Sequence, residues 1–334
     1  MRSAPYPTVL KPYGRALVDL ARQREEVVCL SGDLTRQCEV DLFQQVFPDR
    51  FVHAGMAEAN MMSMAGAMAR EGLQPWVHTF GVFATRRPYD QIVNAIAYPN
   101  LPVRIVGFMP GVSTPGGPSH QAIEDVAIMR ALPHMTVVDV ADAVEISQVV
   151  PQLADLPGPV YLRLKRGEIP MVFDERHRFR VGEAQRLLDG DEITLFTSGM
   201  MLPATLQAAA VLHANGVAAG IVNVPTLKPL DRHAVTAAAR GSGGVVTVEN
   251  HSIIGGLGSA VAEVLAEAGV GVPLRRIGLR DTFAEGSKSA PYLFEKYGLS
   301  TAEIVRTAWE LVGRQGPAPQ VAALEPEPGS YAPV

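Results

Sequence analysis

Short runs rich in valine, isoleucine and leucine alternate along the chain with segments whose apolar residues recur every three or four positions. This alternation is typical of βα units built around a mainly parallel sheet. The runs fall into two series, which predict an α/β protein of two doubly wound domains. The predicted strands are Val27–Leu30, Val103–Val106, Thr136–Val140 and Val160–Leu164 in the first series, and Ile193–Thr197, Ala219–Val224, Gly244–Val248 and Leu274–Ile277 in the second.

The segment between the two series, residues 166–182, is rich in charge and follows neither periodicity. We interpret it as a linker, which places the first domain at residues 1–175 and the second at 183–312. The tail, residues 316–334, contains five prolines and no apolar periodicity, so we predict that it is disordered.

Two helices are predicted in the first domain. Residues 57–71 carry an apolar face and are followed by Gly72, a residue that commonly ends a helix, so Glu58 falls in the first turn. A second helix begins near Pro88 and ends before Pro99. The apolar face of the first helix consists of Met61, Met64, Ala65 and Met68.

The composition is that of a globular protein acting on small molecules or protein surfaces. Of 334 residues, 47% are hydrophobic, and the net charge of -5 comes without a basic cluster, so we expect no nucleic-acid or membrane partner. The N-terminal residues lack the apolar stretch of a signal peptide, which favours a cytoplasmic location. The two cysteines form no CxxC motif, so neither is assigned a role.

Each candidate for chemistry also has an ordinary structural interpretation. Glu58 in a first helical turn is stabilised by the helix dipole, and Phe80 and Phe83 are typical core residues. His120 follows turn-forming residues, so a loop position with a catalytic role is as plausible as a core position. The glycine-rich residues 255–258 fit a tight turn before a helix better than an anion site, because the Rossmann spacing is absent.

Taken together, three ordered motifs resemble the transketolase family. The sequence FVHAGMAEANM at 51–61 resembles the segment that carries the family's thiamine-activating glutamate, and HTFGVF at 78–83 resembles the segment that holds the aminopyrimidine ring. The sequence GPSHQAIE at 117–124 resembles the loop that brings a histidine to the substrate. The resemblance continues through VPTLKPLD at 224–231 and VENH at 248–251, and covers roughly residues 10–312.

The resemblance implies a pyrimidine-binding domain followed by a transketolase C-terminal domain, and thiamine diphosphate chemistry. Glu58 would bond the pyrimidine nitrogen, in protonated form or sharing a proton with the ring, which Met-rich surroundings favour. Phe80 and Phe83 would flank the ring, and His120 would contact substrate oxygens and carry a proton. By the same resemblance we assign Asp33 to the cofactor. Arg86 is assigned to the substrate.

What the sequence lacks is equally informative. The family binds the diphosphate and its magnesium through a GDG motif followed by paired asparagines, and this chain has no such pair of motifs. We therefore expect no metal ligands here and an N-terminal transketolase-like partner chain that carries the diphosphate-binding domain and most of the Mg²⁺ contacts. The expected assembly is α2β2, inactive without the partner.

The substrate residues depart from the family pattern. An acid that the family places four residues before the loop histidine is replaced by Gly116, and a histidine twelve residues before it is replaced by Phe108. Arg166 matches the family's phosphate-binding arginine, although a solvated charge is the ordinary interpretation. Lys11 and Arg36 are further cationic candidates. The departures favour an unusual ketose, modified or without phosphate, and leave the identity of donor and acceptor open.

Two other functions remain open at this point. The chain could be the β subunit of a 2-oxo acid dehydrogenase, although the loop at 117–124 favours transketolase, or a non-catalytic scaffold of the same fold. The joint presence of Glu58, both phenylalanines and His120 argues against the scaffold. The sequence therefore predicts a β-type transketolase subunit that transfers a two-carbon ketol unit from a ketose to an aldose.

Overall fold

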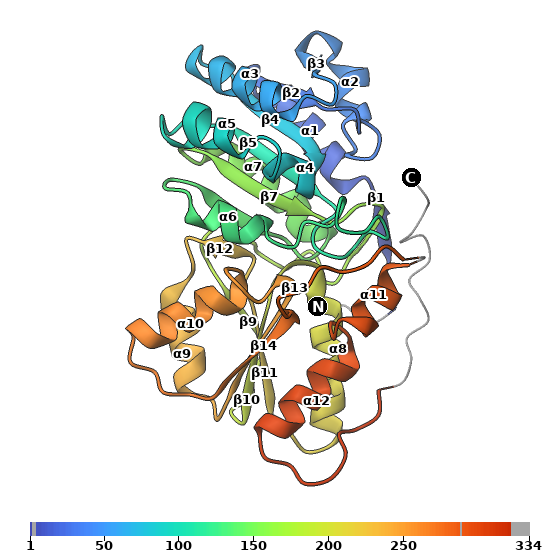
Figure 1. Cartoon of the computed structure of the whole chain (residues 1–334), viewed down its shortest axis with the longest axis vertical. Coiled ribbons are helices and arrows are strands. Elements are labelled where there is room, and N and C mark those ends of the chain that lie inside the picture. The colour runs from blue at the N-terminus through green and yellow to red at the C-terminus, as the bar shows by residue number, and fades with distance from the viewer. Residues whose placement is uncertain (2–4, 288, 322–334) are drawn as a thin grey trace.

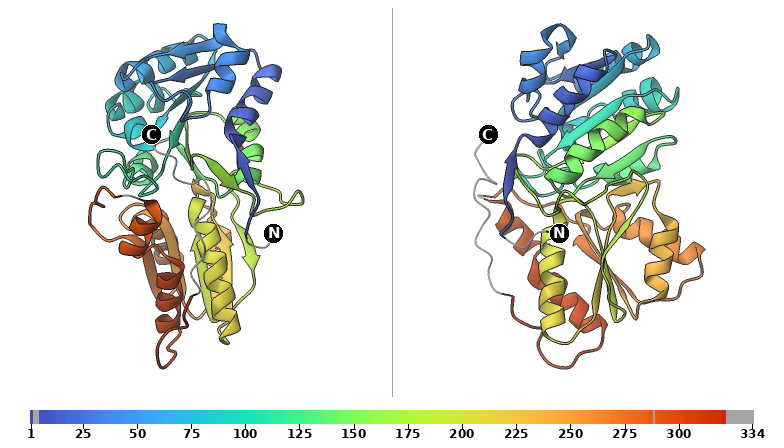
Figure 2. Two further views of the ribbon diagram at one scale, coloured as in Figure 1. Left: turned by 90° about the vertical axis from the view of Figure 1, so that its right-hand side faces the viewer. Right: turned by 180° about the vertical axis from the view of Figure 1, so that it is seen from behind.

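The computed structural model describes residues 1, 5–287 and 289–321 as two α/β units stacked along the long axis of the molecule (Figure 1). Each unit has its own mixed, mainly parallel sheet with helices on both faces (Figure 2). The predicted fold class is thereby confirmed. Of the predicted tail, residues 316–321 have no regular structure and residues 322–334 lie outside the described part of the chain.

The first unit is built on a seven-stranded sheet. Its order is β12-β6-β7-β5-β4-β2-β3, and all pairs are parallel except the antiparallel pair of β12 and β6. The edge strand β12 follows the second unit's strands β9, β10 and β11 in the sequence. A later part of the chain therefore completes the first sheet. The strands are β2 (Val27–Ser31), β3 (Phe51–His53), β4 (Gln74–Phe80), β5 (Arg104–Phe108), β6 (Thr136–Asp139), β7 (Val160–Leu164) and β12 (Thr226–Lys228).

The second unit has a five-stranded sheet of order β14-β13-β10-β11-β9, in which β9 is the antiparallel edge strand. A two-stranded antiparallel ribbon joins the ends of the first unit. These strands are β9 (Gln185–Leu188), β10 (Ile193–Thr197), β11 (Ala219–Asn223), β13 (Val245–Ser252) and β14 (Leu274–Leu279), with β1 (Thr8–Leu10) and β8 (Glu168–Pro170) in the ribbon.

Helices cover both faces of each sheet. In the first unit they are α1 (Pro12–Gln23), α2 (Asp41–Val46), η1 (Pro48–Arg50), α3 (Glu58–Arg70), α4 (Gly81–Thr85), α5 (Tyr89–Gln91), the π-helix η2 (Ile92–Ala97), α6 (Asp125–Ala131) and α7 (Ala143–Asp155). In the second they are η3 (Gly199–Met201), α8 (Leu202–Ala214), α9 (Arg232–Arg240), α10 (Leu257–Glu267), α11 (Ala290–Lys296) and α12 (Thr301–Leu311).

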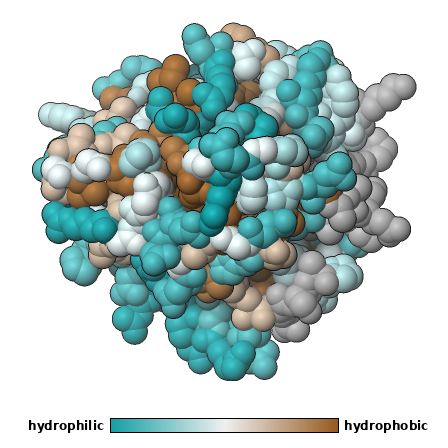
Figure 3. All heavy atoms as spheres, turned by 90° about the horizontal axis from the view of Figure 1, so that it is seen from below, coloured by the Kyte–Doolittle hydropathy of each residue, from teal (hydrophilic) through white to brown (hydrophobic). Residues whose placement is uncertain are grey.

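Two hydrophobic clusters lie on opposite faces of the first sheet. One contains Leu17 and Leu153, from α1 and α7. The other contains Met61 of α3 and continues into the second unit through Phe196 and Leu257. The apolar core thus runs across the junction, which holds the two units together. Seen from the end formed by the second unit, the surface is largely polar, with apolar residues gathered in bands between polar side chains (Figure 3).

All eight predicted strands exist, within a few residues of the predicted bounds, and the helix expected at 57–71 is α3. The sequence interpretation missed β4, because Pro75, His78 and Thr79 interrupt its apolar pattern even though the whole strand is buried. The second predicted helix is only partly regular: a short helical turn, α5, leads into the π-helix η2. At Gly66 of α3, an added Cβ would lie 2.4 Å from the carbonyl oxygen of Ala95, so α3 and η2 pack at backbone contact.

Residues 166–182, which we interpret as a linker between the domains, contain regular structure and buried residues. The segment contains β8, which pairs with β1, and its Phe173 and Phe179 are buried. Charged residues such as Arg176 and Arg178 are exposed. They separate the buried phenylalanines in the sequence, so the segment shows no apolar periodicity. Within the described ranges, no helix has the length and apolar character needed to cross a bilayer.

The glycine-rich turn before α10 binds a carboxyl group of the chain itself. Glu249, within β13, accepts hydrogen bonds from the backbone N–H groups of Leu257 and Gly258 at 2.7 and 2.9 Å. These groups begin α10, where unpaired N–H groups and the helix dipole favour a carboxylate. Residues 255–258 therefore form a structural turn, as the sequence indicated, and the amides of Gly255, Leu257 and Gly258 are bonded within the chain.

We expect a pH-dependent stability from this carboxyl group. Burial raises the pKa of Glu249 to about 7 from an ordinary value of 4.5, against the effect of the two N–H donors. Between these pH values the folded chain binds a proton that the unfolded chain has released, so the free energy of unfolding falls as pH rises through the window. Relative to Glu249→Gln, the wild type should lose up to about 3 kcal/mol between pH 4.5 and 7.

Urea unfolding of both proteins at a series of pH values measures this difference. Glu267→Gln is the matched control, because that carboxylate is exposed and paired with Arg232. Parallel stability curves for the wild type and Glu249→Gln would contradict the assignment.

Candidate functional site

The predicted site residues follow strands whose carboxyl ends meet at one edge of the first sheet. Parallel strands β3, β2, β4, β5 and β7 lie within this sheet, and in such sheets the loops after the strands form the binding crevice. Glu58 follows β3, Phe83 follows β4 and His120 lies in the loop after β5. Residues far apart in sequence are therefore brought together by strand order alone.

Glu58 is the first residue of α3 and its side chain is only 4% exposed. The buried Met61 and Met62 lie in the same helix, as expected of Met-rich surroundings. The surroundings are nevertheless not wholly apolar, because Arg87 donates from Nη1 to Oε1 of Glu58 at 2.7 Å. The sequence interpretation did not include Arg87 in the site.

An aromatic and cationic stack connects this glutamate to the loop histidine. The rings of Phe80 and Phe83 are nearly parallel, with centroids 6.1 Å apart. The guanidinium carbon of Arg87 lies 4.1 Å from the Phe83 centroid, and the His120 ring meets Phe83 edge-on at 5.3 Å. Four of the predicted residues, Glu58, Phe80, Phe83 and His120, thus form one contiguous group, with Arg87 as the link.

The loop that carries His120, residues 109–124, has no helix or strand of its own. Its base is closed by the N–H of Gly111 donating to the carbonyl of Ala122 at 2.9 Å. The Ser119 hydroxyl lies 2.9 Å from Nδ1 of His120. The loop is therefore shaped by individual hydrogen bonds, and each anchor matters for the position of the histidine.

Gly116 contacts His120 directly. A Cβ added at residue 116 would lie 2.7 Å from the Cβ of His120 and 2.9 Å from its Cγ, closer than real side chains approach. The acid that the family pattern would place here does not fit beside the histidine in this loop conformation. The absence of a side chain at this position is thus built into the site.

Arg86, which the resemblance assigned to the substrate, is engaged within the chain. Its Nε and Nη2 donate to the two carboxylate oxygens of Glu124, the latter at 2.8 Å, and Nη1 and Nη2 donate to the carbonyls of Pro118 and Gln121 at 2.7 and 3.0 Å. Every guanidinium nitrogen has a partner. The structure therefore gives no support to the predicted substrate contact of Arg86.

Asp33 and Arg166 also follow strands at this edge of the sheet. Asp33 follows β2 and is exposed, and Arg166 follows β7 and is partly buried. Burial raises the pKa of the nearby Cys38 thiol well above its ordinary value, Asp33 adds to this, and the charge of Arg166 opposes it. The charges of Asp33 and Arg166 therefore act on the same thiol in opposite directions. Lys11 is paired with Asp41 at 2.5 Å.

The second unit holds the base of the loop. Asn250 accepts from the N–H of Val112 at 3.0 Å through Oδ1 and donates to the carbonyl of Pro110 at 3.0 Å through Nδ2. Gln121 donates to the carbonyl of Glu285 at 3.2 Å, and the N–H of Ser287 donates to the carbonyl of Pro115 at 3.0 Å. Segments 250 and 285–287 therefore clamp the loop from the second unit.

A buried charge network lies beneath these contacts. Arg163 of β7 donates to Asp125 from Nε at 2.8 Å and to Asp139 from Nη1 at 2.9 Å. Although burial alone would raise it, the charge of Arg163 holds the pKa of Asp125 below its ordinary value. His251 is buried, which lowers its pKa, and its Nε2 accepts from the N–H of Ala127 in α6 at 3.4 Å. The sequence singled out residues 248–251 but gave no signal for this network.

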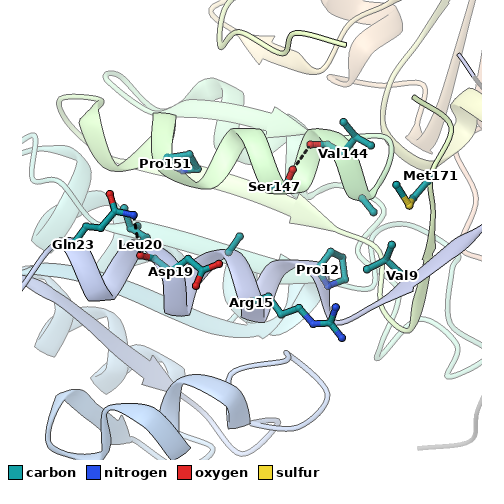
Figure 4. Close-up of a pocket in the computed structure, with 12 residues that line it drawn as sticks. Val9, Pro12, Arg15, Asp19, Leu20, Gln23, Val144, Ser147, Pro151 and Met171 are labelled. Atoms are coloured by element: carbon teal, nitrogen blue, oxygen red, sulfur yellow. Dashed lines mark hydrogen bonds between the residues drawn. The ribbon is translucent and has the colours of Figure 1, made fainter. Parts of the chain in front are cut away.

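The cavity in Figure 4 lies elsewhere, between α1 and α7. It has a volume of about 420 Å³ and is lined by Arg15 and Asp19 of α1, Ser147 of α7, and Met171. None of the predicted site residues lines it. It is a groove between two surface helices and is separate from the catalytic candidates.

The residues at the sheet edge fit the aminopyrimidine of thiamine. Such a ring needs a carboxyl group that shares a proton with its nitrogen and an aromatic face to pack on. In this structure the planar guanidinium of Arg87 uses both features, because it bonds Glu58 while lying over Phe83. Within the described residues, no group of three acidic, histidine or cysteine side chains is placed to hold a metal ion.

Known families and proteins resemble the chain along almost its whole length. Residues 6–171 match the family described as "Transketolase, pyrimidine binding domain" and residues 182–304 match "Transketolase, C-terminal domain". An uncharacterized transketolase family protein of Sinorhizobium fredii is 47% identical over 90% of this chain and 88% of its own length. A 6-deoxy-6-sulfo-D-fructose transketolase subunit of a Clostridium species is 41% identical over 91% and 94%.

Solved structures agree. One titled "Split gene transketolase, inactive beta4 tetramer" is 41% identical, covers 90% of this chain and 97% of its own, and has a TM-score of 0.83. The transketolase of Campylobacter jejuni, at 22% identity and a TM-score of 0.76, shares the fold, and this chain spans 48% of its length. The two family matches, the relatives and the geometry of the site lead to one conclusion: the chain belongs to the transketolase family and corresponds to its pyrimidine-binding and C-terminal domains.

Proposed function

We propose that the chain is the β-type subunit of a thiamine diphosphate-dependent transketolase, active only with a partner that binds the diphosphate and Mg²⁺. The observation that carries the proposal is the contiguous group of Glu58, Phe83 and His120 at the carboxyl edge of the sheet. The lack of a GDG motif followed by paired asparagines supports the need for a partner. So does the solved relative, which is titled an inactive β4 tetramer.

The chain's own residues would have distinct roles. The bound cofactor supplies a thiazolium carbon that acts as nucleophile and electron sink. Glu58 would hydrogen-bond the pyrimidine nitrogen, and Phe83 would flank the ring and exclude water. Arg87, which is 49% exposed and bonds Glu58 in this structure, would have to move aside for the ring. His120 bonds substrate oxygens and transfers a proton there.

The substrate proposal is a ketose that is modified or lacks phosphate. Gly116 and Phe108 replace two of the family's polar substrate contacts, and Phe108 is fully buried. One relative is named a 6-deoxy-6-sulfo-D-fructose transketolase subunit, which supports the proposal of a modified ketose. Arg166 is the proposed contact for an anionic group on the sugar.

Reconstitution with the partner tests the function. We expect association to α2β2 in mass photometry and ketol transfer from at least one of fructose, fructose 6-phosphate and 6-deoxy-6-sulfo-D-fructose to an aldose acceptor. The chain alone should give no turnover. Release of carbon dioxide from pyruvate without ketol transfer, or full activity from this chain by itself, would overturn the proposal.

Glu58→Gln should abolish ketol transfer, because the amide cannot exchange the proton that the pyrimidine requires. A fall in kcat of about 100-fold or more is expected from loss of a general acid–base group. Association with the partner should be unchanged, since Glu58 contacts Arg87 of its own chain. An unchanged rate would favour the scaffold function.

Gly116→Ala should reduce ketol transfer by moving His120. The added methyl group lies too close to the histidine, and a misplacement of about 1 Å can cost about 100-fold in rate. Gly271→Ala is the matched control, because no atom lies within 4 Å of its added Cβ. Equal kcat/KM values for the two variants would contradict the steric explanation.

A further inference from the structure

The loop that presents His120 needs an external support close to the histidine itself. The contacts from the second unit reach residues 110, 112, 115 and 121, and Gly116 forms an antiparallel bridge with Gly286. Within the described ranges, the hydrogen bonds of Ser119 and of the His120 N–H are local ones, to the carbonyls of Gly116 and Gly117. The side chain of Arg86 bonds this part of the loop through the carbonyl of Pro118.

We propose that Arg86 is a positioning residue that fixes His120 for substrate contact, an inference that rests on the proposed function. Its guanidinium bonds the carbonyl of Pro118, two residues before the histidine, and the carbonyl of Gln121, one residue after it. It also bonds both oxygens of Glu124 at the end of the loop. One planar group thus brackets the histidine from both sides.

The position of Arg86 ties the histidine to the ring-binding segment. Arg86 directly follows α4, the short helix that carries Phe83. This helix packs tightly on the loop and sheet, since a Cβ added at Gly81 would lie 3.2 Å from both the Ala122 side chain and the Tyr161 hydroxyl. The aromatic platform and the substrate histidine are therefore held at a fixed separation by adjacent residues of one segment.

Only arginine suits this task. Its five N–H donors lie in one plane and can serve a carboxylate and two carbonyls at once, whereas a lysine offers a single point charge. The hydrogen bond to Glu124 raises the pKa of Arg86 further, so the group stays charged at every working pH. Glu124 itself is about one-third exposed, so its charge is not stranded in the core if Arg86 is removed.

The test combines loop exchange with kinetics in four variants. Arg86→Met removes all four contacts, Arg86→Lys keeps the charge, and Glu124→Gln keeps the two carbonyl contacts. Arg130→Met is the matched control, because Arg130 also bonds a carbonyl, that of Gly255, and a carboxylate, that of Glu263. Hydrogen exchange of residues 113–124 is measured on the full chain, and kcat and KM are measured on the reconstituted pair.

For Arg86→Met we expect exchange in 113–124 to accelerate at least tenfold, including at the His120 amide, which donates to the carbonyl of Gly117. The kcat should fall about 10- to 100-fold with a smaller change in KM, because the histidine is displaced while substrate contacts elsewhere persist. Arg86→Lys and Glu124→Gln should lie between this variant and the wild type. Arg130→Met should leave loop exchange and kcat near wild type.

Unchanged loop exchange in Arg86→Met, or a loss of kcat that Arg130→Met reproduces, would overturn the inference. Should Arg86→Met fail to fold, Glu124→Gln decides in the same way. Wild-type loop exchange and kcat in that variant would overturn the positioning role of Arg86. If the wild-type pair shows no ketol transfer, the proposed function fails, and the exchange experiment still decides whether Arg86 orders the loop.

Discussion

The buried guanidinium of Arg163 is the contact on which the arrangement of the site depends. It lies at the carboxyl end of β7, is almost fully buried, and bonds Asp125 below the His120 loop and Asp139 at the end of β6. It also donates to the carbonyl of Asn250 in the second unit at 3.1 Å. A buried charge is tolerated only when its partners are fixed around it, so this group imposes one mutual orientation on sheet, loop and second unit.

That orientation lets the second unit hold the loop of the first unit that carries His120. Asn250 and the segment 285–287 bond the loop directly, His251 caps the helix that follows it, and β12 completes the first sheet. The two units share an apolar core across their junction. The second unit therefore supports the loop that carries His120.

Two adjacent arginines at the edge of the site have different partners. Arg87 turns to the glutamate and to the ring face of Phe83, while Arg86 turns to the loop. The first is half exposed and paired with Glu58, and the second has every nitrogen bonded within the chain. One short segment thus carries one cation that meets Glu58 and Phe83 and a second that bonds the loop around His120.

The sequence determined the elements whose signals are local. The eight strands, α3 with Glu58 in its first turn, and the order of the three motifs follow from periodicity and from residues in direct succession, and strand order then brings Glu58, Phe83 and His120 to one edge. Only the tertiary structure decided which side chains and strands contact one another. Successive helical residues point about 100° apart, so whether Arg86 or Arg87 meets Glu58 depends on how α4 packs. The same holds for the pairing of β12 with the first sheet and for the hydrogen bonds between Glu249 and the start of α10. In both cases the sequence of one segment does not specify its partner, so the fold decides the contact.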